Sequence, residues 1–334
     1  MDLRVHAWMC QSSAALEQLE KTWGPRLMLL GTGVGLPREL ARELQPGLRS
    51  ILQDLDRCTL TLARSTPQGA ELTLTMSPTA GSASHAWLQN LRPGGRGRIT
   101  LSVPDVFAHV AFDLKGETLP AVCAPFAPFI TSLTAGTSPE ALADQLTAIG
   151  CLDGLGALAI DAEGLQLALG LRDSTRYAEA AFAKSTLARQ QEHLAKQRVD
   201  MEYTVDALVH RDVKVMKSAA LPATPTPWLA TKDGEVLGYL AVAGRFALST
   251  AGGAHGEARI RALIDAALNH TLLAATQEPT TPDAPLASAQ IDLLRLEGAV
   301  PESMRTRLQG EKLAGVLQVE LRSEEHTSEL QSPY

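Results

Sequence analysis

The sequence has few aromatic residues, few cysteines and no long apolar run. Aromatic residues make up 4% of the 334 residues and charged residues 20%, whereas 45% are hydrophobic. No stretch of about 18 apolar residues occurs, so the sequence predicts no membrane-spanning helix. The hydrophobic content excludes a disordered chain. The formal net charge of -7 argues against nucleic-acid binding driven by overall charge.

The cysteines provide neither a disulfide framework nor a metal site. Cys10, Cys58, Cys123 and Cys151 are scattered along the chain, without a C-x-x-C pair. Each is predicted to be a small buried apolar residue.

The usual phosphate-binding patterns are also missing. The segment 26–36 is rich in glycine, but the third glycine of a G-x-G-x-x-G motif would fall on Leu36, and Pro37 opens the next predicted helix. The phosphate loop G-x-x-x-x-G-K-[ST] does not occur. The segment is predicted to be a plain glycine-rich turn, and we expect no bound cofactor.

Leucine and alanine dominate what is present. Together they supply roughly a hundred residues, and both favour helix, yet the hydrophobic periodicity alternates between helices and hairpins. Hairpins are expected over 59–62 with 72–76 and over 155–160 with 165–169. A third is expected from a strand at 228–230, a turn at Lys232–Gly234 and strands at 236–242 and 246–249. Helices are expected over 12–23, 37–55, 81–91, 138–149, 174–197 and 255–273.

This order predicts an α+β fold. We expect one or more antiparallel sheets built from repeated β-hairpin-plus-helix units, with the helices packed on one face. A parallel, Rossmann-like order is the alternative, because helices follow strands often enough to allow it.

Two strand candidates suggest an internal duplication. Asp105–His109 with Asp113–Lys115 resembles Asp206–His210 with Asp212–Lys214, at offsets of 101 and 99 residues. The alternative is that Leu/Ala-rich alternating segments match by composition alone. We predict one α+β unit over 1–150, a second over 151–275, and the start of a further, truncated segment over 286–321.

The end of the sequence has a foreign character. Arg322–Ser332 resembles the translation of a sequencing adapter, so 322–334 is excluded from the fold prediction. Without it the chain has 29 basic and 34 acidic residues, a net charge of -5. Because 315–321 has a strand pattern, we expect the natural protein to continue past Leu321. Asp2–Met9 alternates like a strand without a signal sequence before it, so we expect Met1 to be an internal methionine. A signal peptide upstream would make the protein periplasmic or secreted; otherwise it is cytoplasmic.

Several polar groups are candidates for chemistry. Asp105, His109 and Asp113 are separated by even numbers of residues and share one strand face, but neighbours stand about 13 Å apart. They would need partners from adjacent strands, as would Asp206 and His210, and they are predicted to be solvated sheet-face residues.

Other candidates are explained by local structure. Ser82, Ser84 and His85 lie close together without a G-x-S-x-G elbow, so one serine is predicted to cap the helix over 81–91. His255 and His270 flank a helix without a second ligand, which predicts no metal site. The stretch 189–198 is predicted to be a solvated helix face, and the Pro/Phe-rich 120–129 to pack on the sheet or line a groove. The sequence thus specifies no catalytic, cofactor-binding or metal-ligating set.

The hairpin-plus-helix order and Leu/Ala-rich composition over 1–321 resemble uncharacterised secreted or envelope families of bacteria. The resemblance implies a non-catalytic binding or scaffolding protein, with a groove for an apolar, lipid-like or peptide ligand or a protein partner. One alternative is a hydrolase whose residues converge around His109 or His210. A second alternative is an interaction module of a larger polypeptide.

Overall fold

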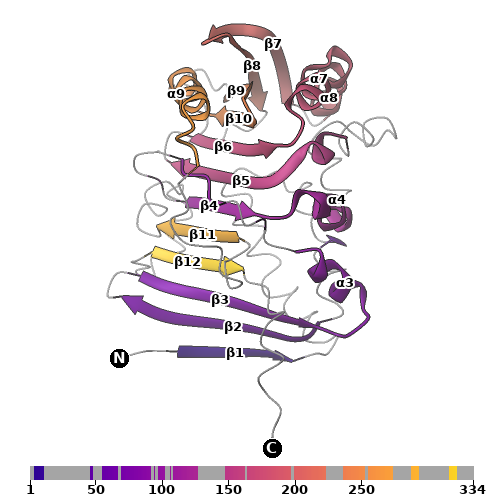
Figure 1. Cartoon of the computed structure of the whole chain (residues 1–334), viewed down its shortest axis with the longest axis vertical. Coiled ribbons are helices and arrows are strands. Elements are labelled where there is room, and N and C mark those ends of the chain that lie inside the picture. Colours follow the sequence, from indigo (N-terminus) through magenta and orange to yellow (C-terminus); the bar gives the residue numbers. More distant parts are fainter. Residues whose placement is uncertain are drawn as a thin grey trace, which may run out of the picture.

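A computed structural model gives the structure of the chain (Figure 1). It describes residues 4–10, 46–47, 55–66, 69–91, 94, 97–101, 106, 108–126, 147–161, 164–196, 199–222, 236–252, 255–273, 287–292 and 316–321. Asp105, the glycine-rich segment 26–36, the turn Asp233–Gly234, the helix expected over 12–23 and the tail 322–334 lie outside these ranges.

The described strands form one twelve-stranded sheet in the order β1-β2-β3-β12-β11-β4-β5-β6-β10-β9-β8-β7. Figure 1 shows them stacked from β1 at the bottom to β6, with β7 to β10 curling at the top. The strands are β1 (Arg4–Cys10), β2 (Leu55–Thr66), β3 (Gly69–Pro78), β4 (Ala108–Asp113), β5 (Leu152–Asp161), β6 (Gly164–Leu171), β7 (Val199–His210), β8 (Val213–Pro222), β9 (Val236–Ala243), β10 (Phe246–Ala251), β11 (Ala287–Asp292) and β12 (Val316–Leu321).

The fold is α+β, as predicted. The seven strands from β4 to β7 in this order are all antiparallel, and among the described pairs only β3 with β12 is parallel. Tight hairpins explain this, because antiparallel neighbours can be joined by two residues and parallel ones cannot. The Rossmann-like alternative is therefore wrong. The helices are α3 (Ala83–Gln89), α4 (Leu119–Cys123), α7 (Ser174–Phe182), α8 (Lys184–Lys196) and α9 (Gly256–Leu268).

One face of the sheet is lined by alanines and covered by α9. The buried core joins residues of α9 such as Ile260 and Ile264 to the alanines of the strands and to larger strand residues such as Leu155 and Leu248. Alanine side chains let a helix approach the sheet closely, and the larger helix residues fill the space between them. The alanines of this face, each at most 3% exposed, are Ala111, Ala157, Ala159, Ala168, Ala241 and Ala243.

The opposite face carries larger aliphatic side chains. Leu158 is paired with Leu167, and Leu240 is paired with Met216, one residue out of step with the alanines of the same strands. Leu158, Leu167 and Leu240 are half-buried. Residues of α7 line a cavity on this side together with Met216 and Val242. Helices therefore lie on both faces, and the prediction of helices on one face is wrong.

The two described strands of the segment 286–321 lie in the middle of the sheet. These strands, β11 and β12, lie between β3 and β4, which come from the first predicted unit. The strand pattern over 315–321 is confirmed as β12. The division of the chain into domains stays a prediction.

The structure does not show the predicted duplication. His109 lies inside β4, between β11 and β5, whereas His210 ends β7 at a two-residue turn at the edge of the sheet. The two motifs thus occupy different settings.

Two expected elements differ in detail. The single helix expected over 174–197 is two helices, because Ala183 adopts an extended conformation (φ -59°, ψ 129°) that ends α7. Of the third predicted hairpin, the strands at 236–242 and 246–249 are confirmed as β9 and β10, with Gly244 and Arg245 at their turn, whereas 228–230 and Lys232–Gly234 lie outside the described residues. The helix over 81–91 is confirmed as α3, and 255–273 contains α9.

Candidate functional site

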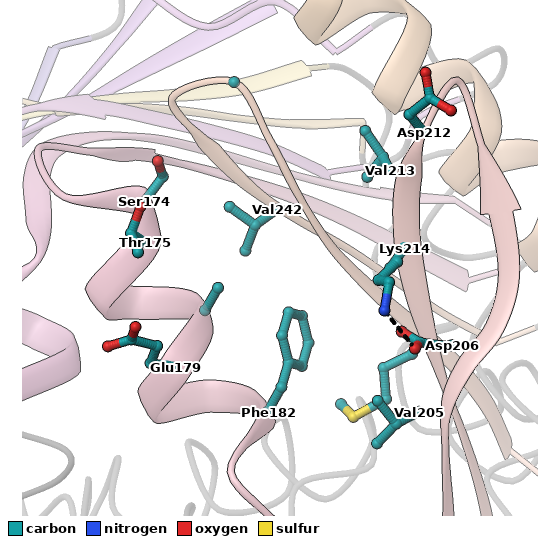
Figure 2. A pocket seen from close by; sticks show the side chains of 13 residues that line it. Ser174, Thr175, Glu179, Phe182, Val205, Asp206, Asp212, Val213, Lys214 and Val242 are labelled. Atoms are coloured by element: carbon teal, nitrogen blue, oxygen red, sulfur yellow. Dashed lines mark hydrogen bonds and ion pairs between the residues drawn. The ribbon is translucent and has the colours of Figure 1, made fainter.

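A cavity of about 600 Å³ lies between α7, the turn of β9 and β10, and the β7–β8 hairpin (Figure 2). In Figure 2 the Phe182 ring projects from α7 into the space between the helix and the hairpin, and Val242 is drawn above it. The lining residues are Ser174, Thr175, Ala178, Glu179, Phe182, Val205, Asp206, Asp212, Val213, Lys214, Met216, Val242 and Gly244.

The helix wall of this cavity is set by local sequence signals. The Asp173 side chain accepts a hydrogen bond from the Arg176 amide at 2.9 Å and caps α7. Ser174 and Thr175 therefore lie in the first turn, and Phe182 is the last helical residue before extended Ala183.

The hairpin wall is shaped by a bulge. Between the pairs Thr204–Lys217 and Leu208–Val215, the residues Val205 to Ala207 of β7 oppose Met216 alone. Asp206 takes a positive φ of 56° at this bulge, and such irregularities re-aim side chains. Its carboxylate accepts a hydrogen bond from the Lys214 ammonium at 2.8 Å, drawn as a dashed line in Figure 2.

The hairpin turn also has left-handed backbone. His210 pairs with Val213, so Arg211 and Asp212 form a two-residue turn, with φ of 49° and 65°. Two successive positive φ values are typical of a type I′ turn, which matches the twist of the strands. We call residues 205–214 the hairpin tip.

Polar contacts join the hairpin tip to α9. His210 Nε2 lies 3.0 Å from Asp265 Oδ1, and Arg211 Nη1 donates to Asp265 at 3.3 Å and to Asn269 at 3.0 Å. Arg261 Nη1 lies 3.3 Å from His210 Nδ1. The hydrogen bond from His210 holds the pKa of the Asp265 carboxyl below its ordinary value of 3.8.

This geometry specifies the tautomer of His210. A guanidinium can only donate, so Nδ1 is the unprotonated acceptor, and the carboxylate of Asp265 can only accept, so Nε2 carries the hydrogen. Both ring nitrogens are engaged, and neither is open to take a proton from a substrate. The contacts of His210 are those of a structural connector between β7 and α9.

His109 and Asp113 share a strand face, as predicted, but Asp113 is buried and not solvated. Asp113 is 9% exposed and His109 is half-buried, because their neighbour Ala111 belongs to the core face. Burial, with a contribution from the Arg98 cation, lowers the pKa of His109 below its ordinary 6.5. Five strands separate β4 from β7, so His109 and His210 do not meet in one site.

The serine candidates are occupied by local structure. Ser82 Oγ accepts the His85 amide hydrogen at 3.1 Å and caps α3, as predicted. The His85 Nδ1 accepts from the Gly81 amide at 3.3 Å, and Ser84 is fully buried. The three side chains do not form a nucleophile with a free base.

The remaining predicted residues lie away from the cavity lining. His255 precedes α9, and His270, with a φ of 58°, follows it. No group of three metal-ligating residues occurs within the part of the chain that the structure describes. No helix in that part is long and apolar enough to cross a membrane.

Among the cysteines whose side chains are described, Cys151 is buried, as predicted, and Cys123 is half-buried. Both are free thiols, and burial raises their pKa. The 120–129 segment is described as far as Phe126, whose ring packs edge-on against Trp87 at 6.5 Å. The Trp87 indole donates to the Val122 carbonyl at 2.9 Å.

The sequence did not point to the cavity. Asp206, His210, Asp212 and Lys214 attracted attention only as part of a repeat. The signal that could have pointed to it is the interrupted alternation of apolar and polar residues before His210. In the structure this interruption is a bulge, and Val205 within it is 45% exposed. No protein-family model, curated protein or solved structure matches this chain.

Proposed function

We propose that this chain is a non-catalytic binding protein for an amphipathic ligand with an apolar body and a cationic head group. The observation that carries the proposal is the cavity between α7 and the hairpin tip, whose volume of about 600 Å³ lies in the range of small-molecule sites. The envelope location rests on the resemblance of the sequence and belongs to the same proposal.

The apolar wall supports a ligand with an aliphatic body. Phe182, Met216 and Val242 line the cavity from three different elements, and Val205 adds an aliphatic side chain that is 45% exposed. Covering apolar surface of this kind is favourable by roughly 25 cal/mol per Å². A ligand that reaches Val205 removes this surface from water.

The charges at the rim support a cationic head. Asp206 is paired with Lys214, whereas Glu179 and Asp212 have no ion-pair partner among the described residues. Figure 2 shows these two carboxylates on opposite sides, Glu179 on α7 and Asp212 at the hairpin turn. The resulting negative rim attracts cations and repels anions.

The test compares ligands that differ only in their head group. We expect decylamine to bind more tightly than decanol by about fivefold, and decanoate to bind most weakly. Binding is measured by isothermal titration calorimetry with the full chain at concentrations where the amphiphiles are monomeric. Equal affinity for all three would remove the cationic head from the proposal, and no binding of any would overturn it.

Two exposed valines of β7 provide a matched pair of variants. Val205 lines the cavity, whereas Val209, 57% exposed, does not. We expect Val205→Ser to weaken all neutral and cationic ligands, and Val209→Ser to leave them unchanged. Asp212→Asn should reduce only the preference for the amine. If Val209→Ser weakens binding as much as Val205→Ser, the ligand lies elsewhere.

The hydrolase alternative finds less support. It needs a histidine that can accept a proton, and His210 is engaged at both ring nitrogens. The interaction-module alternative remains compatible with the cavity, and a peptide that presents a lysine beside apolar residues would share the chemistry of the proposed ligand.

A further inference from the structure

The hairpin tip extends beyond the main ladder of the sheet. The pairs between β8 and β9 run from Ala220–Val236 to Val215–Ala241 and end there. β7 is the last strand of the sheet, so the tip has strand pairs only within its own hairpin. Its position is therefore set by contacts outside the ladder.

The base of the same hairpin is held differently. Tyr203 Oη donates to Gln190 at 2.9 Å, and Gln191 Nε2 donates to the Met201 carbonyl at 3.0 Å, which attaches α8 to β7 before the bulge. Burial raises the pKa of Tyr203 to about 12, so its hydroxyl stays a donor. The bulge after Thr204 thus separates an anchored base from the tip.

Beyond the bulge, the tip is attached to α9. Leu208 and Val213 pack against the edge of the core, and His210 and Arg211 reach Asp265. These polar contacts are directional, because one carboxylate oxygen receives both donors.

The cavity depends on where this tip lies. Val205, Asp206, Asp212, Val213 and Lys214 all belong to the tip and line the cavity, whereas Asp265 does not line it. A change at Asp265 therefore reaches the cavity only through the position of the hairpin.

We propose that Asp265 is a positioning residue that, through His210 and Arg211, latches the hairpin tip over the cavity and so governs ligand release. The effect on the ligand rests on the proposed function. The effect on the tip does not, and it is measured without ligand.

Two variants test the latch by different routes. Asp265→Ala removes a carboxylate whose side chain is 44% exposed. Arg211→Asn removes the guanidinium that contacts Asp265. Asparagine also suits the left-handed turn better than arginine, because it tolerates positive φ. If Arg211 served only the turn, Arg211→Asn would make the tip more rigid. If Arg211 is part of the latch, the same substitution makes the tip more mobile. Asp200→Ala, which removes an exposed carboxylate from the base of the same hairpin, is the matched control.

The readout is hydrogen exchange of peptides that cover the tip, compared with peptides from β10 and α9. We expect both variants to speed exchange in the tip by about fivefold, with the β10 and α9 peptides and the control unchanged. Unchanged tip exchange in both variants would overturn the latch.

Ligand release separates the two proposals. With bound decylamine, we expect the latch variants to dissociate about fivefold faster at an unchanged melting temperature. Faster tip exchange without any decylamine binding would reject the proposed function and retain the latch on the tip. Binding with unaltered tip exchange would reject the latch alone.

Discussion

At the scale of single residues, the ion pairs of this protein differ in how deeply their side chains are buried. Asp161 and Arg259 form an ion pair at 2.8 Å whose side chains are 5% and 14% exposed, whereas Arg261 and Glu257 pair on the exposed surface of the same helix. A buried charge that loses its partner stays uncompensated, while an exposed one is solvated. The two pairs should therefore respond very differently to mutation.

Arg259→Met tests this difference. It leaves Asp161 buried without its arginine, and we expect a loss of about 3 kcal/mol in the free energy of unfolding. Arg261→Met, on the same helix, removes the exposed pair with Glu257 together with the 3.3 Å contact to His210, and this comparison variant should still cost less than about 1 kcal/mol. Urea denaturation of both variants measures the two values. Equal losses would show that burial does not decide the strength of these pairs.

At the scale of elements, the alanine face explains the position of α9. The helix contacts β9 and β10 through Ile260, Leu263 and Ile264. On this face β9 presents Ala241 and Ala243, and β10 presents the larger Phe246 and Leu248 opposite them. Gly256 belongs to the same arrangement, because a Cβ there would come within 2.8 Å of the Tyr239 ring. Close approach of the first helical turn requires glycine at this position.

A larger residue on the alanine face should push α9 away. Ala241 is completely buried, so Ala241→Leu overpacks the core, and we expect it to destabilise the protein by about 1–3 kcal/mol. Ala258→Leu adds the same volume at an exposed position of α9 and should have little effect. Thermal unfolding followed by circular dichroism compares the two, and a tolerated Ala241→Leu would mean that the helix has room to move.

At the scale of the whole molecule, titrating groups limit stability on both sides of neutral pH. Burial lowers the pKa of His109 below 6.5, so the unfolded chain binds that proton more readily than the folded one. Burial also raises the pKa of Cys151 above 9.0, so the folded chain keeps a thiol proton that the unfolded chain loses. In both residues the largest cause of the shift is burial, which disfavours the charged form.

We expect maximum stability between about pH 6.5 and 9, the ordinary pKa values of the two groups. Stability should fall as the pH drops below 6.5, until the folded His109 is itself protonated, and again as the pH rises above 9. His109→Gln should flatten the acid side, and Cys151→Ala should reduce the alkaline side. Chemical denaturation from pH 5 to pH 10 measures the profile. If stability fell below pH 6.5 as steeply in His109→Gln as in the unaltered protein, His109 would not be its cause.

The hairpins are the part of the fold that local sequence signals predict. Alternation over β5, β6, β9 and β10, and the cap at Ser82, predicted strands and a helix start that the structure confirms. These features depend on contacts within a few residues, such as side-chain alternation and a hydroxyl beside an amide. The same local signals established the α+β class.

The local signals failed where distant segments decide the outcome. The placement of β11 and β12 between β3 and β4 depends on pairing across more than a hundred residues, which no periodicity encodes. The sequence did not predict helices on both faces, because strands in the middle of the sheet are apolar on both sides. Alternation of apolar and polar residues then no longer identifies a solvated face.

The sequence by itself indicated the hairpins β2–β3, β5–β6 and β9–β10, the helices α3 and α9, and the absence of familiar nucleotide and metal motifs. The tertiary structure alone decided that His210 meets Asp265 and that a cavity forms beside Phe182. Those contacts join residues that are tens of positions apart, and they exist only once the ladder between β8 and β9 ends and the tip turns toward α9. Contacts of that kind follow from packing, which a one-dimensional pattern does not contain.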